Sequence, residues 1–297
     1  MMASQASHTP EQLVADLTLL LDLEPKGGDR FIGRRRPDGT GRVFGGQAIA
    51  QALGAARRTV DDEREAHSLH AYFLRPGSDD LPIEYRVKRD LDGRSFSNRR
   101  VVASQDGKPI LNLTVSFQIP VEGPGHQSPQ MPDVPGPEDL VSDTQMRERV
   151  AKFLPEGQLR TLALRPSPVD FRSVEPRDWM RPEVRDPISH VWFRTVAPLP
   201  VETAVHRAVL AYISDFQLLA TALHPHAKTF FDGSVKGASL DHAIWFHEGF
   251  RADEWMLYVT ESPWSGHARG LGRGQIFTRE GRLVASVMQE GMLRHVR

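Results

Sequence analysis

One acidic side chain stands alone in a long apolar stretch of this sequence. Asp215 lies within residues 210–226, LAYISDFQLLATALHPH, and is the only acidic residue between Glu202 and Asp232. Apolar residues recur three and four positions apart and also fill most positions between, which predicts a buried helix. A carboxylate there is costly to desolvate unless it is hydrogen-bonded or charge-paired. Asp215 is therefore a candidate for acid–base chemistry; the alternative is that it caps a helix starting at Phe216.

The histidines of the second half do not form a metal-binding pattern. His242 and His247 fall in a predicted strand and project from opposite faces of it. His224 and His226 flank Pro225, a spacing more typical of a chain leaving a helix than of a ligand pair. The chain has no cysteine, which excludes disulfides, metal–thiolate sites and a cysteine nucleophile. We expect no metal and no cofactor.

The composition is that of an ordinary globular protein. The chain has 297 residues, 39% of them hydrophobic and 25% charged, with a formal net charge of −1. This charge gives no reason to expect a nucleic-acid partner or an anionic membrane surface. The sequence has neither a long apolar run typical of a membrane span nor the basic start and apolar core of a secretory signal. We expect a cytoplasmic protein without a stable membrane anchor.

The elements that must position Asp215 follow one plan twice. A short helix after Thr9 comes first, and an Ala-rich helix opened by Gly45 and Gly46 follows it. Strand-like runs come next, separated by turn dipeptides, at 67–75, 82–90, 95–105 and 109–119. Beyond a stretch rich in proline and glycine at 120–138 and a charged surface helix within 139–160, two strands are expected around 162–174 and 190–196. A helix at 203–224 then precedes runs near 237–247, 254–262, 268–278 and 282–295. Helices followed by antiparallel strands indicate an α+β fold.

The two halves also correspond residue by residue. Residues 67–70 align with 238–241 at an offset of 171, and the turn at 106–108 aligns with 280–282 at an offset of 174. Gln47 falls opposite Asp215 at an offset of 168. Offsets that drift this little indicate a tandem duplication. We expect a pseudo-dimer whose sheets join edge to edge, with neutral Gln47 in the place of the carboxylate in the first half.

Four arginines crowd residues 30–36. They indicate a solvated loop or the outer face of an edge strand. The alternative is that some of them meet a phosphate-bearing ligand.

Six blocks of this sequence follow one another in a distinctive order. They are VFGGQAIAQAL (43–53), HSLHAYFLRPG (67–77), RSFSNRRVVASQDG (94–107), AYISDFQLL (211–219), ASLDHAIWFH (238–247) and GRLVASVMQEGMLR (281–294). Together they resemble the type II acyl-CoA thioesterases. The resemblance spans roughly residues 30–297 and implies a double hotdog fold, in which each half wraps an antiparallel sheet around one long helix. It also divides the chain into a first half at 10–120, a linker with a surface helix at 121–160, and a second half at 161–297 that carries the catalytic residues.

The resemblance implies a chemistry for particular residues. In that family an Asp, a hydroxyl residue and a Gln activate a water molecule that hydrolyses fatty acyl-CoA to fatty acid and CoA. By motif these residues are Asp215, Gln289 in VASVMQEG, and Ser239 in ASLDH, where the family usually has Thr. The family also implies an apolar channel for the acyl chain, surface Arg or Lys near the CoA phosphates, and a homo-oligomer, either a dimer or a tetramer of the double unit.

Two alternatives remain open at this point. A hotdog enoyl-CoA hydratase carries its histidine five residues after its Asp, where this chain has Ala220 after Asp215. A non-catalytic hotdog protein that binds acyl-CoA would need no such partner. A serine hydrolase of the α/β class is disfavoured, because the sequence has no G-x-S-x-G motif.

Overall fold

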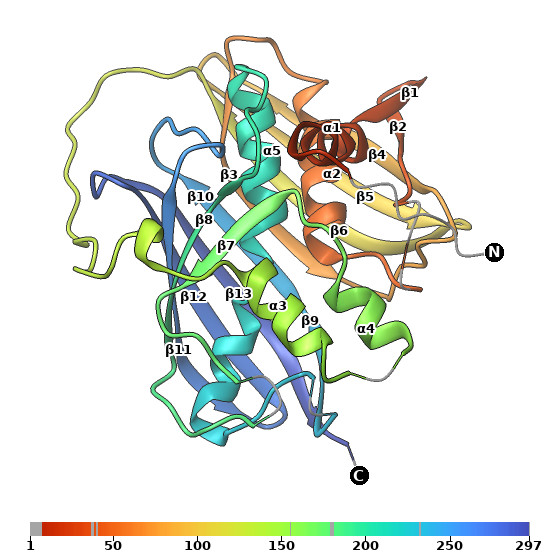
Figure 1. Cartoon of the computed structure of the whole chain (residues 1–297). Coiled ribbons are helices and arrows are strands. Elements are labelled where there is room, and N and C mark those ends of the chain that lie inside the picture. Colours follow the sequence, from red (N-terminus) through yellow and green to blue (C-terminus); the bar gives the residue numbers. More distant parts are fainter. Residues whose placement is uncertain are drawn as a thin grey trace.

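The structure of the protein is a computed structural model that describes residues 8–36, 39, 41–154, 156–178, 181–231 and 233–296 (Figure 1). The described helices are α1 (Pro10–Leu21), α2 (Gly45–Arg57), α3 (Asp143–Ala151), α4 (Gln158–Ala163) and α5 (Thr203–Ser214), with 3-10 segments η1 (Pro137–Asp139) and η2 (Leu219–His226). None of these helices is long and apolar enough to cross a lipid bilayer.

The strands form one antiparallel sheet, in which the second half repeats the strand arrangement of the first half in reverse order. The order β1-β2-β4-β5-β6-β3 of the first half meets β10-β13-β12-β11-β8-β7 of the second half, and β9 pairs with β13 outside this path. The halves join where Leu69 pairs with Ile244. This order confirms the expected edge-to-edge pseudo-dimer. The strands are β1 (Leu23–Gly27), β2 (Arg30–Gly33), β3 (Glu65–Phe73), β4 (Ile83–Asp92), β5 (Phe96–Gln105), β6 (Lys108–Gln118), β7 (Val169–Ser173), β8 (Ile188–Thr195), β9 (Val235–Ser239), β10 (Asp241–Phe246), β11 (Met256–Gly266), β12 (Arg269–Thr278) and β13 (Leu283–His295).

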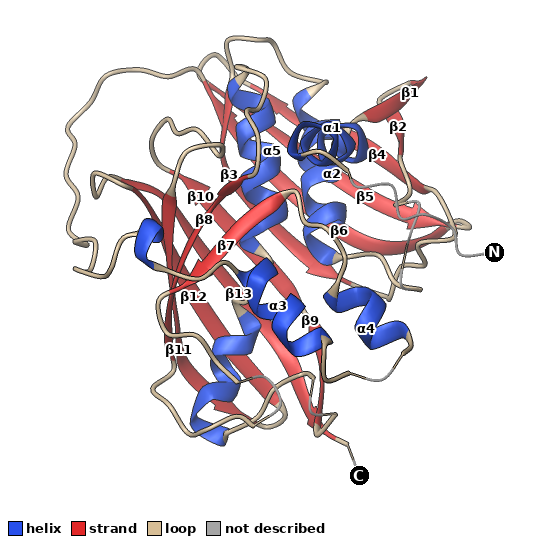
Figure 2. Ribbon diagram, viewed as in Figure 1, coloured by secondary structure: helices blue, strands red, loops and turns tan. Residues whose placement is uncertain are grey.

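The helices α2 and α5 lie side by side against the same face of the curved sheet (Figure 2). Both are buried on nearly all sides; Ala50 of α2 and Leu210 of α5 have no exposed surface. The many alanines of α2 allow the two helices to approach closely, because a small side chain keeps neighbouring backbones near one another. One helix per half, packed on an antiparallel sheet, confirms the α+β class and the double hotdog architecture.

The helix expected at 203–224 is not continuous. α5 ends at Ser214, Asp215 is its C-cap with φ −80° and ψ −10°, and the chain turns through Gln217, whose φ is 65°. A left-handed residue cannot continue an α-helix, so the chain resumes as the separate 3-10 segment η2. The alternative reading of Asp215, as the N-cap of a helix starting at Phe216, is wrong for the same reason.

The expected correspondence of Gln47 with Asp215 is also wrong. Gln47 is the third residue of α2, whereas Asp215 directly follows the last residue of α5. α2 and α5 begin 158 positions apart, at residues 45 and 203, but β3 and β10 begin 176 apart, at residues 65 and 241. The second half has extra chain between its helix and its strands, which includes η2, so no single offset relates the two copies. Gln47 instead donates from Nε2 to the carbonyl of Arg34 at 3.2 Å.

The end of α2 that corresponds to the Asp215 end of α5 is occupied by a buried arginine. Arg99 of β5 is 1% exposed. Its Nε donates to Thr59 Oγ1 at 2.8 Å, and its other nitrogens donate to the carbonyl of Thr59 at 2.9 Å and to that of Leu91 at 2.9 Å. Asp92 accepts a further, charge-assisted bond. These bonds satisfy the guanidinium and tie the chain after α2 to the sheet.

The stretch that joins the two halves has its own structure. It runs exposed and extended from residue 120, and Gln127 fastens it to the second half by donating to the carbonyl of Gly281 at 2.9 Å. The surface helix expected within 139–160 is confirmed as α3, which Ser142 opens with a capping box to Gln145.

The structure places the arginines at 30–36 in different surroundings, and their contact with a phosphate-bearing ligand stays a prediction. Arg30 lies on β2, near an edge of the sheet, and its Nε donates to Glu84 at 3.0 Å. Arg35 donates to the carbonyl of Asp80 at 2.5 Å. Arg36 instead lines a cavity, together with Asp215.

Candidate active site

Asp215 connects the two halves of the molecule. From the end of α5 its carboxylate reaches the N-terminus of α2, where the Gly46 N–H donates to Oδ2 at 2.8 Å. Phe44, the N-cap residue of α2, makes no capping bond through its side chain. Asp215 therefore caps the helix of the other half, where the partial positive charge of the helix terminus favours a carboxylate.

Two glycines make this approach possible. A Cβ atom at Gly46 would lie 2.4 Å from the carbonyl oxygen of Tyr212, and one at Gly45 would lie 2.7 Å from Asp215 Oδ2. Any other residue at 46 would require movement of the backbone, and one at 45 would displace the Asp215 carboxylate. The Gly45–Gly46 pair thus allows the start of α2 to meet the end of α5.

The other two candidate residues of the sequence meet Asp215 through one amide. Gln289 of β13 is 1% exposed, and its Nε2 donates to Asp215 Oδ1 at 2.8 Å and to Ser239 Oγ at 2.5 Å. Ser239 ends β9, which pairs with β13 so that Ser239 lies opposite Gly291. Three residues separated by up to 74 positions of sequence therefore form one hydrogen-bonded group.

The surroundings of Asp215 favour its protonated form more than water does. Burial raises the pKa of Asp215 from 3.8 to about 6, and the hydrogen bonds from Gln289 and Gly46 partly offset this rise. The side chain keeps some exposure, but toward an internal cavity that it lines. At neutral pH it is mostly ionised and close to the pKa at which a carboxylate both takes up and releases a proton.

The cavity beside these residues has a volume of about 780 Å³, and both halves of the chain form its walls. Asp215 and Ser239 lie in its wall, next to an aromatic group in which the rings of Phe44 and Phe216 are 4.5 Å apart. Apolar side chains of α3, including Met146 and Val150, line it as well. The space is large enough for an apolar ligand of moderate size.

Sequence reasoning missed several parts of this site. The Gly45–Gly46 pair was visible but indicated only a turn into a packed helix, because the sequence does not show that α5 crosses it. Nothing in the charged sequence of α3 indicated that Met146 and Val150 face a cavity. His242 was assessed only as a metal ligand, yet it is fully buried and contacts Ser214 Oγ through Nε2 at 2.9 Å.

Comparisons with known proteins agree with this geometry. A family model described as acyl-CoA thioesterase matches residues 170–292, and one described as the N-terminal domain of acyl-CoA thioesterases matches residues 34–118. The chain is 39% identical to acyl-CoA thioesterase 2 of Haemophilus influenzae, over 95% of this chain and 98% of that protein. It is also 39% identical to human acyl-coenzyme A thioesterase 8, over 94% of this chain and 88% of the human protein.

Solved structures give the same answer. The crystal structure of the acyl-CoA thioesterase II TesB2 from Mycobacterium marinum matches with a TM-score of 0.77 at 40% identity, over 94% of this chain and 98% of that one. A hot dog fold protein from Alicyclobacillus acidocaldarius matches with a TM-score of 0.74 at 19% identity, which supports the fold alone. The fold and these relatives together define a double hotdog hydrolase. The chain belongs to the acyl-CoA thioesterase family, so its enzyme class is that of the acyl-CoA thioester hydrolases, and the hydratase and non-catalytic alternatives are not favoured.

Proposed function

We propose that the protein hydrolyses fatty acyl-CoA with a water molecule activated by Asp215, Ser239 and Gln289. The observation that carries this proposal is the convergence of the three side chains on one hydrogen-bonded group in the wall of an apolar cavity. Asp215 supplies the base. The Ser239 hydroxyl lines the cavity and both donates and accepts, which suits it to fix the orientation of a water molecule. The Gln289 amide holds Asp215 and Ser239 in place through its two N–H donors.

The reaction balances with these groups alone. The water oxygen bonds to the thioester carbonyl carbon while Asp215 takes up the water proton. The tetrahedral oxyanion then collapses, the carbon–sulfur bond breaks, and the proton held by Asp215 passes to the departing sulfur. The products are a fatty acid and CoA, with the carboxylate restored.

The start of α2 is the proposed binding site for the oxyanion. Gly45 lines the cavity, and its N–H has no hydrogen-bond acceptor among the described residues. The neighbouring Gly46 N–H is already bonded to Asp215. A free N–H at a helix N-terminus, next to the base, suits a developing negative charge.

The variant Asp215→Asn tests the assignment. Asn keeps the shape of the side chain but cannot accept the water proton, so we expect kcat to fall by at least about 100-fold, as for the loss of a general base. Release of free CoA from a medium-chain acyl-CoA is the measurement, with the Tm as a check on folding. Turnover within a few-fold of the wild type would refute the role of Asp215.

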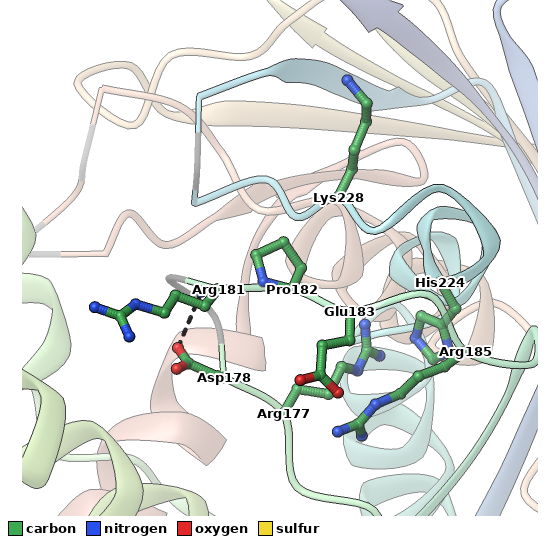
Figure 3. Close-up of a pocket in the computed structure, with 8 residues that line it drawn as sticks. All are labelled: Arg177, Asp178, Arg181, Pro182, Glu183, Arg185, His224 and Lys228. Carbon is green, nitrogen blue, oxygen red and sulfur yellow. Dashed lines mark hydrogen bonds between the residues drawn. The ribbon is translucent and has the colours of Figure 1, made fainter.

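A second, basic pocket of about 310 Å³ suits the phosphates of CoA (Figure 3). Arg177 and Lys228 line both this pocket and the large cavity, so the two spaces adjoin. Four cationic side chains line it against two carboxylates, those of Asp178 and Glu183. The backbone N–H of Arg181 donates to Asp178 at 3.1 Å, which occupies one of these carboxylates (Figure 3).

Arg177 gives the strongest indication that this pocket binds an anion. Burial and the neighbouring Arg185 lower the pKa of Arg177 to about 10. Its guanidinium has no hydrogen bond or ion pair with a described residue. The charge of Glu175 offsets this lowering of the pKa only in part, and a phosphate in the pocket would supply further negative charge to the half-buried cation. His224 on the same wall is held neutral, because burial and Arg177 lower its pKa to about 4.

Substrates that lack the phosphates test this assignment. We expect Arg177→Ala to raise KM for an acyl-CoA on the order of 10-fold, since a charge-assisted bond contributes roughly 1.5–3 kcal/mol. The KM for the matching acyl-pantetheine, which has no phosphate, should not change. Arg279→Ala, which removes an arginine paired with Glu138 elsewhere on the surface, is the matched control. An equal effect on both substrates would refute the phosphate pocket.

The remaining parts of the proposal concern organisation. We propose that 10–120 and 161–297 are the two hotdog units and 121–160 their linker, supported by the palindromic order of the strands. We also propose that the protein works in the cytoplasm as a homo-oligomer. Light scattering after size exclusion tests the assembly, with a single double-hotdog unit as the contrary result. Fractionation of the cells that make the protein tests the compartment.

A further inference from the structure

A buried histidine stands directly behind the amide that joins the three proposed catalytic residues. His242 and Gln289 belong to the paired strands β10 and β13, in which Ala243 lies opposite Met288. Extending this register by one residue places His242 opposite Gln289. The following pair, Asp241 with Glu290, also keeps this register, because the Glu290 N–H donates to Asp241 Oδ1 at 2.6 Å. Cross-strand neighbours on one face are close enough for their side chains to touch.

Each of the two side chains has one polar end bonded and one polar end unsatisfied. His242 Nε2 contacts Ser214 Oγ at 2.9 Å, and Gln289 Nε2 donates to Asp215 and Ser239. The buried atoms His242 Nδ1 and Gln289 Oε1 have no partner at normal hydrogen-bond geometry among the described residues. Gln289 nevertheless acts on the ring, since its hydrogen bonding partly offsets the effect of burial, which lowers the pKa of His242 to about 3. The imidazole is therefore neutral throughout the working range of pH.

We propose that His242 is a positioning residue, which donates from a neutral Nδ1–H to Gln289 Oε1 and so fixes the Gln289 amide with its NH₂ group toward Asp215. This inference rests on the catalytic group proposed above and adds the residue that orients it. His242 lines neither the large cavity nor the basic pocket, so it is distinct from residues that contact the substrate.

The need for such a residue follows from the amide itself. A Gln side chain has an acceptor and a donor of nearly the same size, and only its neighbours decide which end faces which way. A flipped Gln289 would turn its oxygen toward the ionised Asp215, and two acceptors would then face each other. A proton on His242 Nδ1 disfavours that flip, since the ring would then meet an NH₂ group. The same tautomer makes Nε2 an acceptor for the Ser214 hydroxyl at 2.9 Å. Ser214 Oγ also lies 3.0 Å from the Ala211 carbonyl, so the proposal requires that its single proton goes to Nε2.

The tautomer of His242 is the first test. In protein with ¹⁵N-labelled histidine, with the His242 signals assigned by loss in His242→Asn, we expect Nδ1 to carry the proton and Nε2 to carry none. This readout does not depend on which residues are catalytic. A proton on Nε2 would overturn the proposal.

Substitutions give the second test. The amide nitrogen of Asn lies near the position of His Nδ1, whereas that of Gln lies near Nε2, so the two variants keep different ends of the ring. We expect His242→Asn to retain kcat within a few-fold. His242→Gln, which keeps only the Ser214 contact, and His242→Leu should lose roughly 10–100-fold in kcat at unchanged KM, because small displacements of positioned groups have effects of this size. Equal kcat in the Asn and Leu variants would contradict the proposal.

A double-mutant cycle separates this proposal from the proposed function. If Gln289→Leu lowers kcat strongly, adding His242→Leu should reduce the remaining rate no further, because both substitutions remove the same interaction between the two side chains. If Gln289→Leu leaves kcat unchanged, the proposed catalytic group is wrong, whatever His242 does. If Gln289→Leu is inactive while His242→Leu is folded and fully active, only the role of His242 is wrong.

Discussion

At the scale of single residues, the position of Asp215 combines two opposing effects. Burial disfavours the carboxylate, while the Gly46 N–H, the Gln289 amide and the terminus of α2 favour it. The net effect is a pKa of about 6, high enough for efficient return of the proton and low enough for the base to be ionised at neutral pH. The hydrogen bonds that hold the base in place thus also limit how far its pKa rises.

The dependence of activity on pH follows from this value. Only ionised Asp215 accepts the water proton, so we expect kcat/KM to rise with pH, with an apparent pKa near the value of about 6 held by the free enzyme, and to level off above it. Initial rates with one acyl-CoA between pH 5 and 8 measure this. A flat profile across pH 5–7 would rule out Asp215 as the base.

The free energy of unfolding should also depend on pH through Asp215, and the direction of this dependence follows from its raised pKa. The folded pKa of about 6 lies above the ordinary value of 3.8 for an aspartate, so the folded state binds the proton more tightly. The wild type is therefore stabilised below pH 3.8 relative to its state above pH 6, and this contribution is lost as pH rises through about 6. Relative to Asp215→Asn, we expect the wild type to lose about 2 kcal/mol of unfolding free energy between pH 4 and pH 7.

Urea unfolding of both proteins across that range gives the difference directly. His224 and His242, whose pKa values burial lowers, affect stability in both proteins alike and cancel in the comparison. A difference in stability that stays constant with pH, or that grows in the opposite direction, would contradict the raised pKa of Asp215.

At the scale of elements, the site depends on the contact between the end of α5 and the start of α2. Gly46→Ala tests this contact, because the new Cβ would lie 2.4 Å from the Tyr212 carbonyl oxygen and would push the helices apart. We expect kcat to fall on the order of 100-fold, as for a displacement of about 1 Å, together with a loss of roughly 1–3 kcal/mol in stability. Kinetics and urea unfolding measure the two effects.

A matched control is available in the same helix. A Cβ at Gly54 would meet Leu23 at an ordinary 3.5 Å, and Ala favours helix over Gly. We expect Gly54→Ala to keep full activity and to be as stable as the wild type or slightly more so. If both variants behave alike, the close approach at Gly46 does not matter for function.

The sequence predicted elements well where local signals decide them. The strands of both meanders lie within about two residues of their expected positions at most ends, because turn dipeptides such as Asp106–Gly107 mark where each strand stops; Asp106 and Gly107 both have positive φ. The start of α1 after Thr9 is also confirmed, because a Thr that caps a helix is a local signal. The break after Ser214 was not predictable, since apolar residues continue through η2 and periodicity alone cannot show a left-handed turn at Gln217.

The residues of the proposed site could be named from the sequence, but their contacts could not. The family resemblance named Asp215, Ser239 and Gln289, and the structure brings the three together. No local pattern reveals that Asp215 caps a helix 169 positions away, or that His242 stands behind Gln289. These contacts arise from the pairing of β10 with β13 and from the crossing of α2 and α5, which are tertiary properties.

At the scale of the whole molecule, the site is shared between halves that the chain joins only through an exposed linker. Asp215, Ser239 and Gln289 come from the second half, but Gly45 and Gly46 come from the first. The sheet is continuous across the β3–β10 pairing, and the two central helices pack together. The peptide linker near residue 123 is thus not needed to hold the site once the protein has folded.

A nick in the linker tests this. A protease site inserted between residues 121 and 125 leaves the Gln127 contacts intact, and we expect the cut protein to keep its activity and to elute as one species. After unfolding in urea and dilution, recovery of activity should depend on concentration for the cut protein but not for the uncut one, because refolding becomes bimolecular. Loss of activity on cutting, without unfolding, would show that the linker itself holds the site.

The buried Arg99 has a consequence for the history of the chain. Two identical subunits related by symmetry must place the same residue at both helix ends, so a substitution that improves one end alters the other as well. Two copies within one polypeptide are free of that restriction, and here one end holds the carboxylate of Asp215 while the other holds the guanidinium of Arg99. The two copies can therefore differ at this helix end, although both contribute to the proposed site, the second through Asp215 and the first through Gly45 and Gly46.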